Sequence, residues 1–150
     1  GRSFPASAKA EKSNQSQQTW RDTEVFVEDI YPIDIRYDLV IDGRIYQKHG
    51  LPKSLLQMLA DGHGISNNRK LVFKIREHNV KGDFSVLWKV LNRGPEARDR
   101  DQIRGTIERS NYADNTRKES SDFKGNHSVE CYACQNGVIV ARDIIAVPII

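Results

Sequence analysis

Apolar residues alternate with other residues along much of the chain, a period of two that predicts β-strands. The clearest case is residues 84–91, where Phe, Val, Trp and Val occupy every second position and so share one face. The turn-forming sequence Asn-Arg-Gly-Pro at 92–95 ends this strand. We therefore expect Trp88 to point into the core, and the alternative is a base-stacking role for its indole.

The first strand is predicted for residues 33–41, where Ile, Tyr and Leu side chains face one side and mostly polar residues the other. The Asp-Gly pair at 42–43 is a turn signal, so residues 44–48 are expected to return as a short second strand. A short amphipathic helix should follow, with Pro52 at its first position and Gly62 as its stop.

Further strands are predicted for residues 71–75 and near 102–109, and a polar loop follows them. Asn136-Gly137 lies between two alternating apolar runs, which is the strongest short-range signal of a β-hairpin. In the last run the apolar side changes near residues 142–143, which predicts a β-bulge at that point.

About seven short strands, one short helix and no alternation of strands with helices indicate a mainly β protein, an antiparallel β-sandwich. The inward Trp88 lies on a middle strand and faces a strand that carries cysteine. This is the immunoglobulin-like arrangement without its disulfide. A β-barrel is the alternative architecture.

The chain has 150 residues, which fits one domain and a tail. Residues 1–19 are rich in Ser, Gln and Lys, so we expect a linker or disordered tail from an upstream domain, with the sandwich in residues 20–150. The net charge is +3, with acids interleaved among the bases, which points to neither duplex DNA nor an anionic membrane. No membrane span or secretory signal is found, and a cytoplasmic location is expected.

Cys131 and Cys134 form a C-x-x-C motif, which in other proteins is half of a zinc site or a redox pair. The alternation in residues 129–134 instead predicts a strand, which sends the two sulfurs to opposite faces. We expect buried or half-buried free thiols, with no metal and no cofactor. Zinc binding and redox chemistry are the alternatives.

Three arginines, Arg93, Arg104 and Arg117, are candidates for binding phosphate, because a guanidinium group matches phosphate oxygens with paired hydrogen bonds. The alternative is a solvated charged edge, in which they pair with nearby carboxylates such as Glu119. No catalytic triad, carboxylate pair or phosphate-binding loop can be assembled from the sequence. We therefore expect no catalysis in this segment.

Tyr132 shares strand parity with Glu130 and is expected to face away from Cys131 and the core. It is therefore the better candidate for stacking on a nucleobase. His127 precedes this strand and could donate a hydrogen bond to a ligand, or it could be an ordinary histidine of a surface loop.

Several separated blocks resemble one known family: YPIDIRYDLVIDG (31–43), WKVLNRGPEA (88–97), QIRG (102–105) and the segment 124–149. They are similar to the sensor domain at the C-terminus of some adenylyl/guanylyl cyclases and of SMODS nucleotidyltransferases. The resemblance covers residues 20–150. It implies a regulatory module, itself not an enzyme, attached to an upstream cyclase or nucleotidyltransferase domain that makes second messengers in bacterial antiviral defence.

The resemblance further implies recognition of a nucleotide-like ligand or an infection cue. Four residues of the matching blocks look like polar family positions: Arg104, Arg117, Glu119 and His127. The predicted ligand-binding set is Arg93, Arg104, Arg117, Glu119, His127 and Tyr132. A protein-interaction module is the alternative function, as is a non-specific nucleic-acid-binding domain, although a nucleic-acid partner is not favoured.

Overall fold

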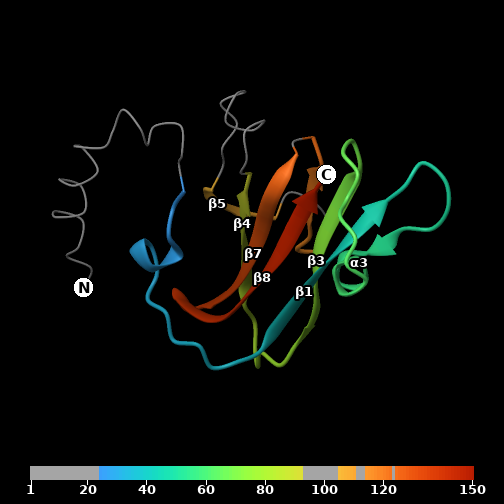
Figure 1. Cartoon of the computed structure of the whole chain (residues 1–150). Helices are drawn as coiled ribbons and strands as arrows, with labels where there is room; N and C mark the ends of the chain where they lie inside the picture. The colour runs from blue at the N-terminus through green and yellow to red at the C-terminus, as the bar shows by residue number, and fades with distance from the viewer. Residues whose placement is uncertain (1–23, 93–104, 111–113, 123) are drawn as a thin grey trace, which may run out of the picture.

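A computed structural model of the protein describes residues 24–92, 105–110, 114–122 and 124–150. These residues form two four-stranded sheets that pack face to face (Figure 1). All strand pairs within the two sheets are antiparallel. The elements in chain order are η1 (Val27–Asp29), β1 (Leu39–Tyr46), β2 (Lys53–Ser54), α3 (Leu55–Ala60), β3 (Lys70–His78), β4 (Ser85–Leu91), β5 (Ile107–Arg109), β6 (Arg117–Ser120), β7 (Gly125–Gln135) and β8 (Val138–Ile149).

The strand order is immunoglobulin-like, as the sequence predicts. One sheet has the order β2-β1-β3-β6 and the other β5-β4-β7-β8. Strands β1, β3 and β6 take the places of A, B and E in that fold, and β4, β7 and β8 take those of C, F and G. The sandwich is therefore confirmed and the barrel is not formed, with eight strands in the described residues against about seven expected.

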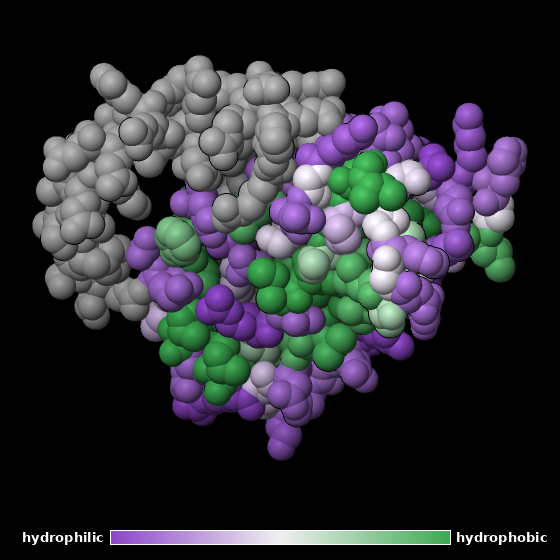
Figure 2. Space-filling view, in the orientation of Figure 1, coloured by the Kyte–Doolittle hydropathy of each residue, from purple (hydrophilic) through white to green (hydrophobic). Residues whose placement is uncertain are grey.

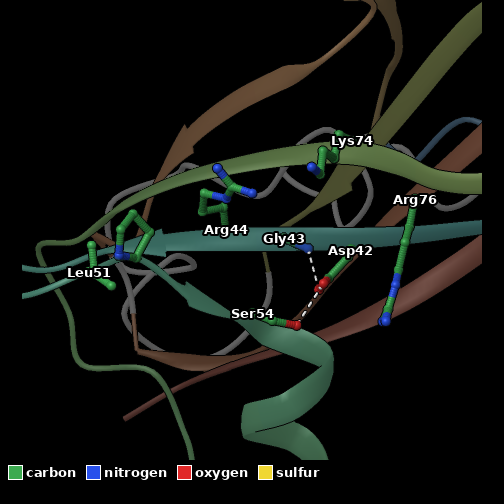
Figure 3. A pocket seen from close by; sticks show the side chains of 8 residues that line it. Asp42, Gly43, Arg44, Leu51, Ser54, Lys74 and Arg76 are labelled. Atoms are coloured by element: carbon green, nitrogen blue, oxygen red, sulfur yellow. Dashed lines mark hydrogen bonds between the residues drawn. The ribbon is translucent and has the colours of Figure 1, made fainter.

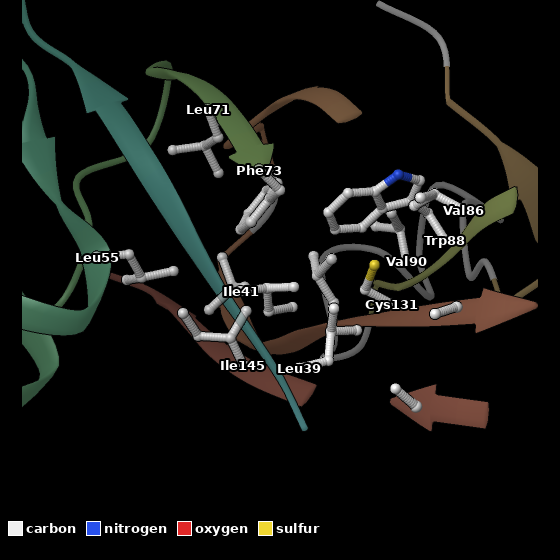
Figure 4. Packing of buried hydrophobic residues seen from close by; sticks show 14 of the residues in the cluster. Leu39, Ile41, Leu55, Leu71, Phe73, Val86, Trp88, Val90, Cys131 and Ile145 are labelled. Atoms are coloured by element: carbon white, nitrogen blue, oxygen red, sulfur yellow. The ribbon is translucent and has the colours of Figure 1, made fainter. Parts of the chain in front are cut away.

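The main core fills the space between the sheets, and Trp88 lies in it as predicted (Figure 4). Its side chain is 1% exposed, and its strand partner on β7 is Cys131. The indole Nε1 donates to Ser110 Oγ at 3.1 Å and to the carbonyl oxygen of Asn115 at 3.2 Å. Because the indole is enclosed and its only donor is satisfied, Trp88 is a core residue and not a stacking platform.

A second apolar cluster lies on the outer face of the β5-β4-β7-β8 sheet. It is covered by residues 24–36, which we call the strap. Val27 of the strap is 1% exposed and packs against this face with Leu87 and Ile139. The strap is tied down by backbone hydrogen bonds, among them Asp34 N–H to Ile139 O at 2.9 Å. Figure 1 shows it, in blue, beside this sheet before the chain enters β1.

The turn predicted at Asp42-Gly43 is wrong, because β1 runs without a break from Leu39 to Tyr46. Position 43 needs a glycine because β1 packs closely against Phe73: a Cβ on Gly43 would lie 2.8 Å from Cε1 of Phe73. The strand also begins later than the predicted Ile33, which forms only an isolated parallel bridge with Ile139 of β8.

The predicted helix exists, but it starts at Leu55 rather than at Pro52. Ser54 caps it by accepting a hydrogen bond from Gln57 N–H at 3.3 Å. Lys53 and Ser54 pair with β1 as the two-residue strand β2, which the sequence did not indicate. Gly62 follows the helix with a φ of +76°, in agreement with its predicted role as a stop.

The β7–β8 hairpin is confirmed. Asn136 and Gly137 have φ angles of 51° and 77°, as a two-residue type I′ turn requires. The predicted bulge is present but lies earlier: Ala133 pairs with Ala141 and Cys134 with Ile139, so Val140 has no partner across the hairpin. The polar stretch expected to be a loop contains β6, which pairs with β3 at the sheet edge.

Candidate functional site

Three of the six predicted site residues lie together at one end of the sandwich. Glu119 of β6 and His127 of β7 both line a cavity of about 20 Å³ between the sheets. That volume has room for one water molecule and none for a nucleotide. Arg117 adjoins them through an ion pair with Glu119, whose oxygen lies 2.8 Å from Arg117 Nε. His127 is 5% exposed, so it is a buried strand residue and not a loop histidine.

Arg117 joins the two sheets instead of facing a ligand. Its side chain is 7% exposed, and its NH2 nitrogen lies 2.9 Å from a carboxylate oxygen of Glu108 on β5. Its NH1 nitrogen donates to the carbonyl oxygen of Arg109 at 3.1 Å. All three guanidinium nitrogens therefore have acceptors from the protein. Ion pairing, the alternative expected for this arginine, describes the structure better than the phosphate fork.

Tyr132 has the predicted parity but not the predicted exposure. It faces away from Cys131, yet it is 1% exposed because the strap covers that side of the sheet. Its hydroxyl donates to Glu130 Oε1 at 2.7 Å. Burial raises the pKa of this hydroxyl well above its ordinary value, and the bond to the Glu130 carboxylate raises it further. The ring has no open face for a base, so the expectation of an exposed stacking residue is wrong.

The predicted set is therefore not gathered into one pocket. Tyr132 lies on the outer face of the β5-β4-β7-β8 sheet, whereas Glu119 and His127 line the cavity between the sheets. Arg93 and Arg104 lie outside the described residues.

The two cysteines project to opposite faces, as predicted. Cys131 belongs to the core between the sheets and Cys134 to the cluster under the strap, and both are free. Burial raises the pKa of the Cys131 thiol, with a further contribution from the nearby Asp143 carboxylate. The thiol of Cys131 is therefore a poor nucleophile at neutral pH. Within the described ranges, no group of three or more His, Cys, Asp and Glu residues could hold a metal ion.

The larger openings lie elsewhere, beside the β2-β1-β3 part of the other sheet and helix α3. Two pockets of about 480 and 650 Å³ share Ser54 and Arg76 as lining residues, and together we call them the basic groove. Both volumes are in the range of sites for small molecules. Side chains that line them and carry or can carry positive charge are Arg44, Lys53, His63, Lys74 and Arg76.

Asp42 builds the wall between β1 and α3 (Figure 3). Its carboxylate accepts hydrogen bonds from Ser54 Oγ at 2.6 Å, Gly43 N–H at 2.7 Å and Leu56 N–H at 3.0 Å. This side chain is 9% exposed. It thus fixes the start of the helix against the sheet and has little surface left for the cations around it.

A bulge in β3 places Arg76 at the junction of the two pockets. Ile41 pairs with Ile75 and Val40 with Glu77, which leaves Arg76 without a partner across the strand pair. Lys74 and Arg44 lie on the same outer face of the sheet as Arg76, and Figure 3 shows all three around the groove. All three side chains are exposed.

The chain matches the family model of the Adenylyl/Guanylyl and SMODS C-terminal sensor domain over residues 21–150. It belongs to this sensor family. A search of curated proteins found no significant match. The family description names a C-terminal sensor domain, which makes the basic groove a candidate for binding a ligand.

The basic groove of this sensor domain was not predicted from the sequence. The signal was present in LVFKIREH, where Lys74 and Arg76 alternate with the apolar Phe73 and Ile75 and so face outward. The turn predicted at Asp42-Gly43 puts Arg44 on a return strand, which hides its place beside β3. In the part of the sensor domain that the structure describes, no helix is long and apolar enough to cross a membrane.

Proposed function

We propose that this sensor domain recognises a nucleotide-like, phosphate-bearing ligand in the basic groove and thereby controls an attached cyclic-oligonucleotide synthase. One observation carries the proposal. Arg44, Lys74 and Arg76 line the groove, are exposed, and form no ion pair or side-chain hydrogen bond within the described structure. Like charges gathered on one face repel one another, and an anionic ligand relieves that repulsion.

The groove also suits the rest of a nucleotide. Arg44 and Arg76 supply guanidinium forks, which bind phosphate oxygens in pairs. Leu51, which is 85% exposed, and Pro52 line the same pocket, and they offer apolar surface to a base. Phosphate-binding and apolar groups are thus within one cavity of about 480 Å³.

The regulatory part of the proposal rests on family membership. A sensor at the C-terminus of a synthase acts by binding a cue in one conformation more tightly than in another. Bacterial antiviral defence as the setting, and the cytoplasm as the location, belong to this proposal as well.

A thermal-shift and calorimetric comparison tests the ligand class. ATP, GTP and a cyclic dinucleotide should raise the melting temperature, and adenosine without phosphate should not. Arg44→Ala and Arg76→Ala should each weaken binding by about 1.5–3 kcal/mol, the size of a hydrogen bond to a charged group. Arg109→Ala is the matched control, because Arg109 is exposed on β5 of the other sheet. Equal loss in all three variants, or no binding of any phosphate compound, would contradict the proposal.

A protein-interaction surface is the second candidate, because apolar side chains are exposed along the strap and β8. Phe26, Ile30 and Ile144 are 48%, 49% and 59% exposed. Arg142 of β8 lies 3.8 Å from Glu28 of the strap, which brings the two segments together. If this surface holds the upstream domain, Ile144→Lys should abolish regulation of the synthase and leave nucleotide binding unchanged.

A further inference from the structure

The positive charge on the β2-β1-β3-β6 sheet continues beyond the groove. On β3, Lys70, Lys74 and Arg76 are exposed on the outer face, with the half-buried Val72 among them. Alternate residues of a strand are about 6.7 Å apart, so Lys70 and Arg76 are about 20 Å apart along it. The cations therefore form a row along β3, which is longer than a binding site for one phosphate group needs to be.

The neighbouring strands widen this row. Arg44 of β1 and Lys118 of β6 are the strand partners of Val72 on its two sides. Lys70 and Lys74, like Arg44, form no side-chain ion pair or hydrogen bond among the described residues. The acid within this area is Asp42, which is 9% exposed and already accepts hydrogen bonds. Exposed carboxylates lie at its margin, at Glu77, Asp61 and Asp122.

An aromatic ring stands at one end of the row. Tyr46 is the strand partner of Lys70 and is 40% exposed. Exposed aromatic rings beside cations are the elements with which proteins bind single strands, since bases stack on the ring while phosphates follow the charge. A duplex fits less well, because its major groove admits a helix or a two-stranded ribbon and not the face of a four-stranded sheet.

We propose that the outer face of the β2-β1-β3-β6 sheet binds a single-stranded oligonucleotide along β3, with Arg76, Lys74 and Lys70 on separate phosphates of the strand and Tyr46 against a base. We call this row of cations on β3, from Lys70 to Arg76, together with Tyr46, the track. This inference rests on the proposed function, because the basic groove is one end of the track. It names the ligand class as an oligonucleotide in place of a mononucleotide.

Fluorescence anisotropy with labelled oligouridylate and oligothymidylate tests the track. Affinity should rise from about 4 to about 12 nucleotides, within the usual site size for single-strand binders. With three or four phosphate contacts at a slope of about −0.7 each, affinity should fall roughly 20- to 50-fold between about 50 and 200 mM salt. Unlabelled ATP should compete only weakly.

The decisive variant is Lys70→Glu, because Lys70 does not line the groove. It should weaken binding of the longer oligonucleotide at least about tenfold and leave ATP binding unchanged, and Tyr46→Ala should weaken it about five- to tenfold or more. Arg109→Glu, with the same change of net charge on the other sheet, is the control. Melting temperatures without ligand, and a Lys70→Gln variant, check that the fold is kept.

The outcomes separate the two proposals. Length-dependent binding that needs Lys70 supports the track. Mononucleotide binding that needs Arg76, with no gain from length and no effect of Lys70→Glu, overturns the track and leaves the proposed function standing. Binding of neither mononucleotide nor oligonucleotide overturns both.

Discussion

At the scale of single residues, the sensor domain uses buried charge to join its sheets. Arg117 of β6 contacts Glu119 on its own strand and Glu108 on β5 of the other sheet, at 2.8 and 2.9 Å. Asp143 of β8 makes a similar link, since its Oδ2 accepts from Ile41 N–H of β1 at 2.9 Å. Each link lies near a sheet edge or a bulge, where strand pairing leaves polar groups to be satisfied.

Removing the Arg117 link should lower the free energy of unfolding of the protein. Arg117→Ala takes the guanidinium group away from the carboxylates of Glu108 and Glu119, and we expect a loss of about 3 kcal/mol in the free energy of unfolding. Arg117→Lys should restore only part of it, because an ammonium group lacks the fork that reaches three acceptors. Urea unfolding with an unchanged m-value measures both, and Arg109→Ala should stay within about 0.5 kcal/mol. If Arg117 instead bound ligand without a structural role, its alanine variant would be as stable as that control.

The buried Cys131 thiol predicts a loss of stability in alkali. Its pKa in the folded state is raised above the ordinary value of 9.0, so the unfolded state releases its proton first as the pH rises. Stability is unaffected by this thiol below that value and falls above it by about 1.4 kcal/mol per pH unit. Urea unfolding at about pH 8 and about pH 10 should show a smaller difference for Cys131→Ala than for the wild type.

At the scale of elements, the strap decides the character of one whole sheet face. It brings Glu24 to within 3.0 Å of Lys89, whose ammonium also lies 3.4 Å from Glu130. Lys89 is 3% exposed, so a charge on β4 that would otherwise face water is enclosed with its partners. The strap therefore converts an outer sheet face into a second, partly charged core.

Loosening the strap should expose Cys134 and not Cys131. Val27→Asp places a carboxylate in the cluster that contains Cys134, and the cost of burying it should release the strap. Alkylation by iodoacetamide, followed by mass spectrometry of peptides, should then modify Cys134 at least about tenfold faster, equivalent to about 1.4 kcal/mol of easier opening. Cys131, which lies between the sheets, is the internal control. Equal acceleration at both thiols would mean that the variant unfolds globally and that the strap is no separate unit.

At the scale of the whole molecule, the two outer faces of the sandwich differ in character. One carries the strap, through which the chain enters the domain, and the other carries the exposed cations of β1 and β3. Figure 2 shows apolar and polar patches interleaved on the side seen there, with a mostly hydrophilic margin on the right, where the β1–β2 loop projects in Figure 1. The packed core connects the cationic face to the strap side of the molecule, and the Arg117–Glu108 and Asp143–Ile41 links cross from one sheet to the other.

The features that the sequence predicted correctly are local. The inward Trp88, the opposite faces of Cys131 and Cys134, and the hairpin at Asn136-Gly137 follow from the period of a strand and from the backbone freedom of turn residues. These depend on residues within a few positions of each other. Sequence alone therefore sufficed for the fold class.

Contacts between distant segments decided the rest. Gly43 is a packing glycine because Phe73 lies against it, and Tyr132 is buried because the strap crosses its side of the sheet. The basic groove exists because pairing of β1 with β3 brings Arg44 beside Lys74 and Arg76. Periodicity tells which side of a strand a residue faces; only the tertiary structure decides whether water, another segment or a ligand site meets that side.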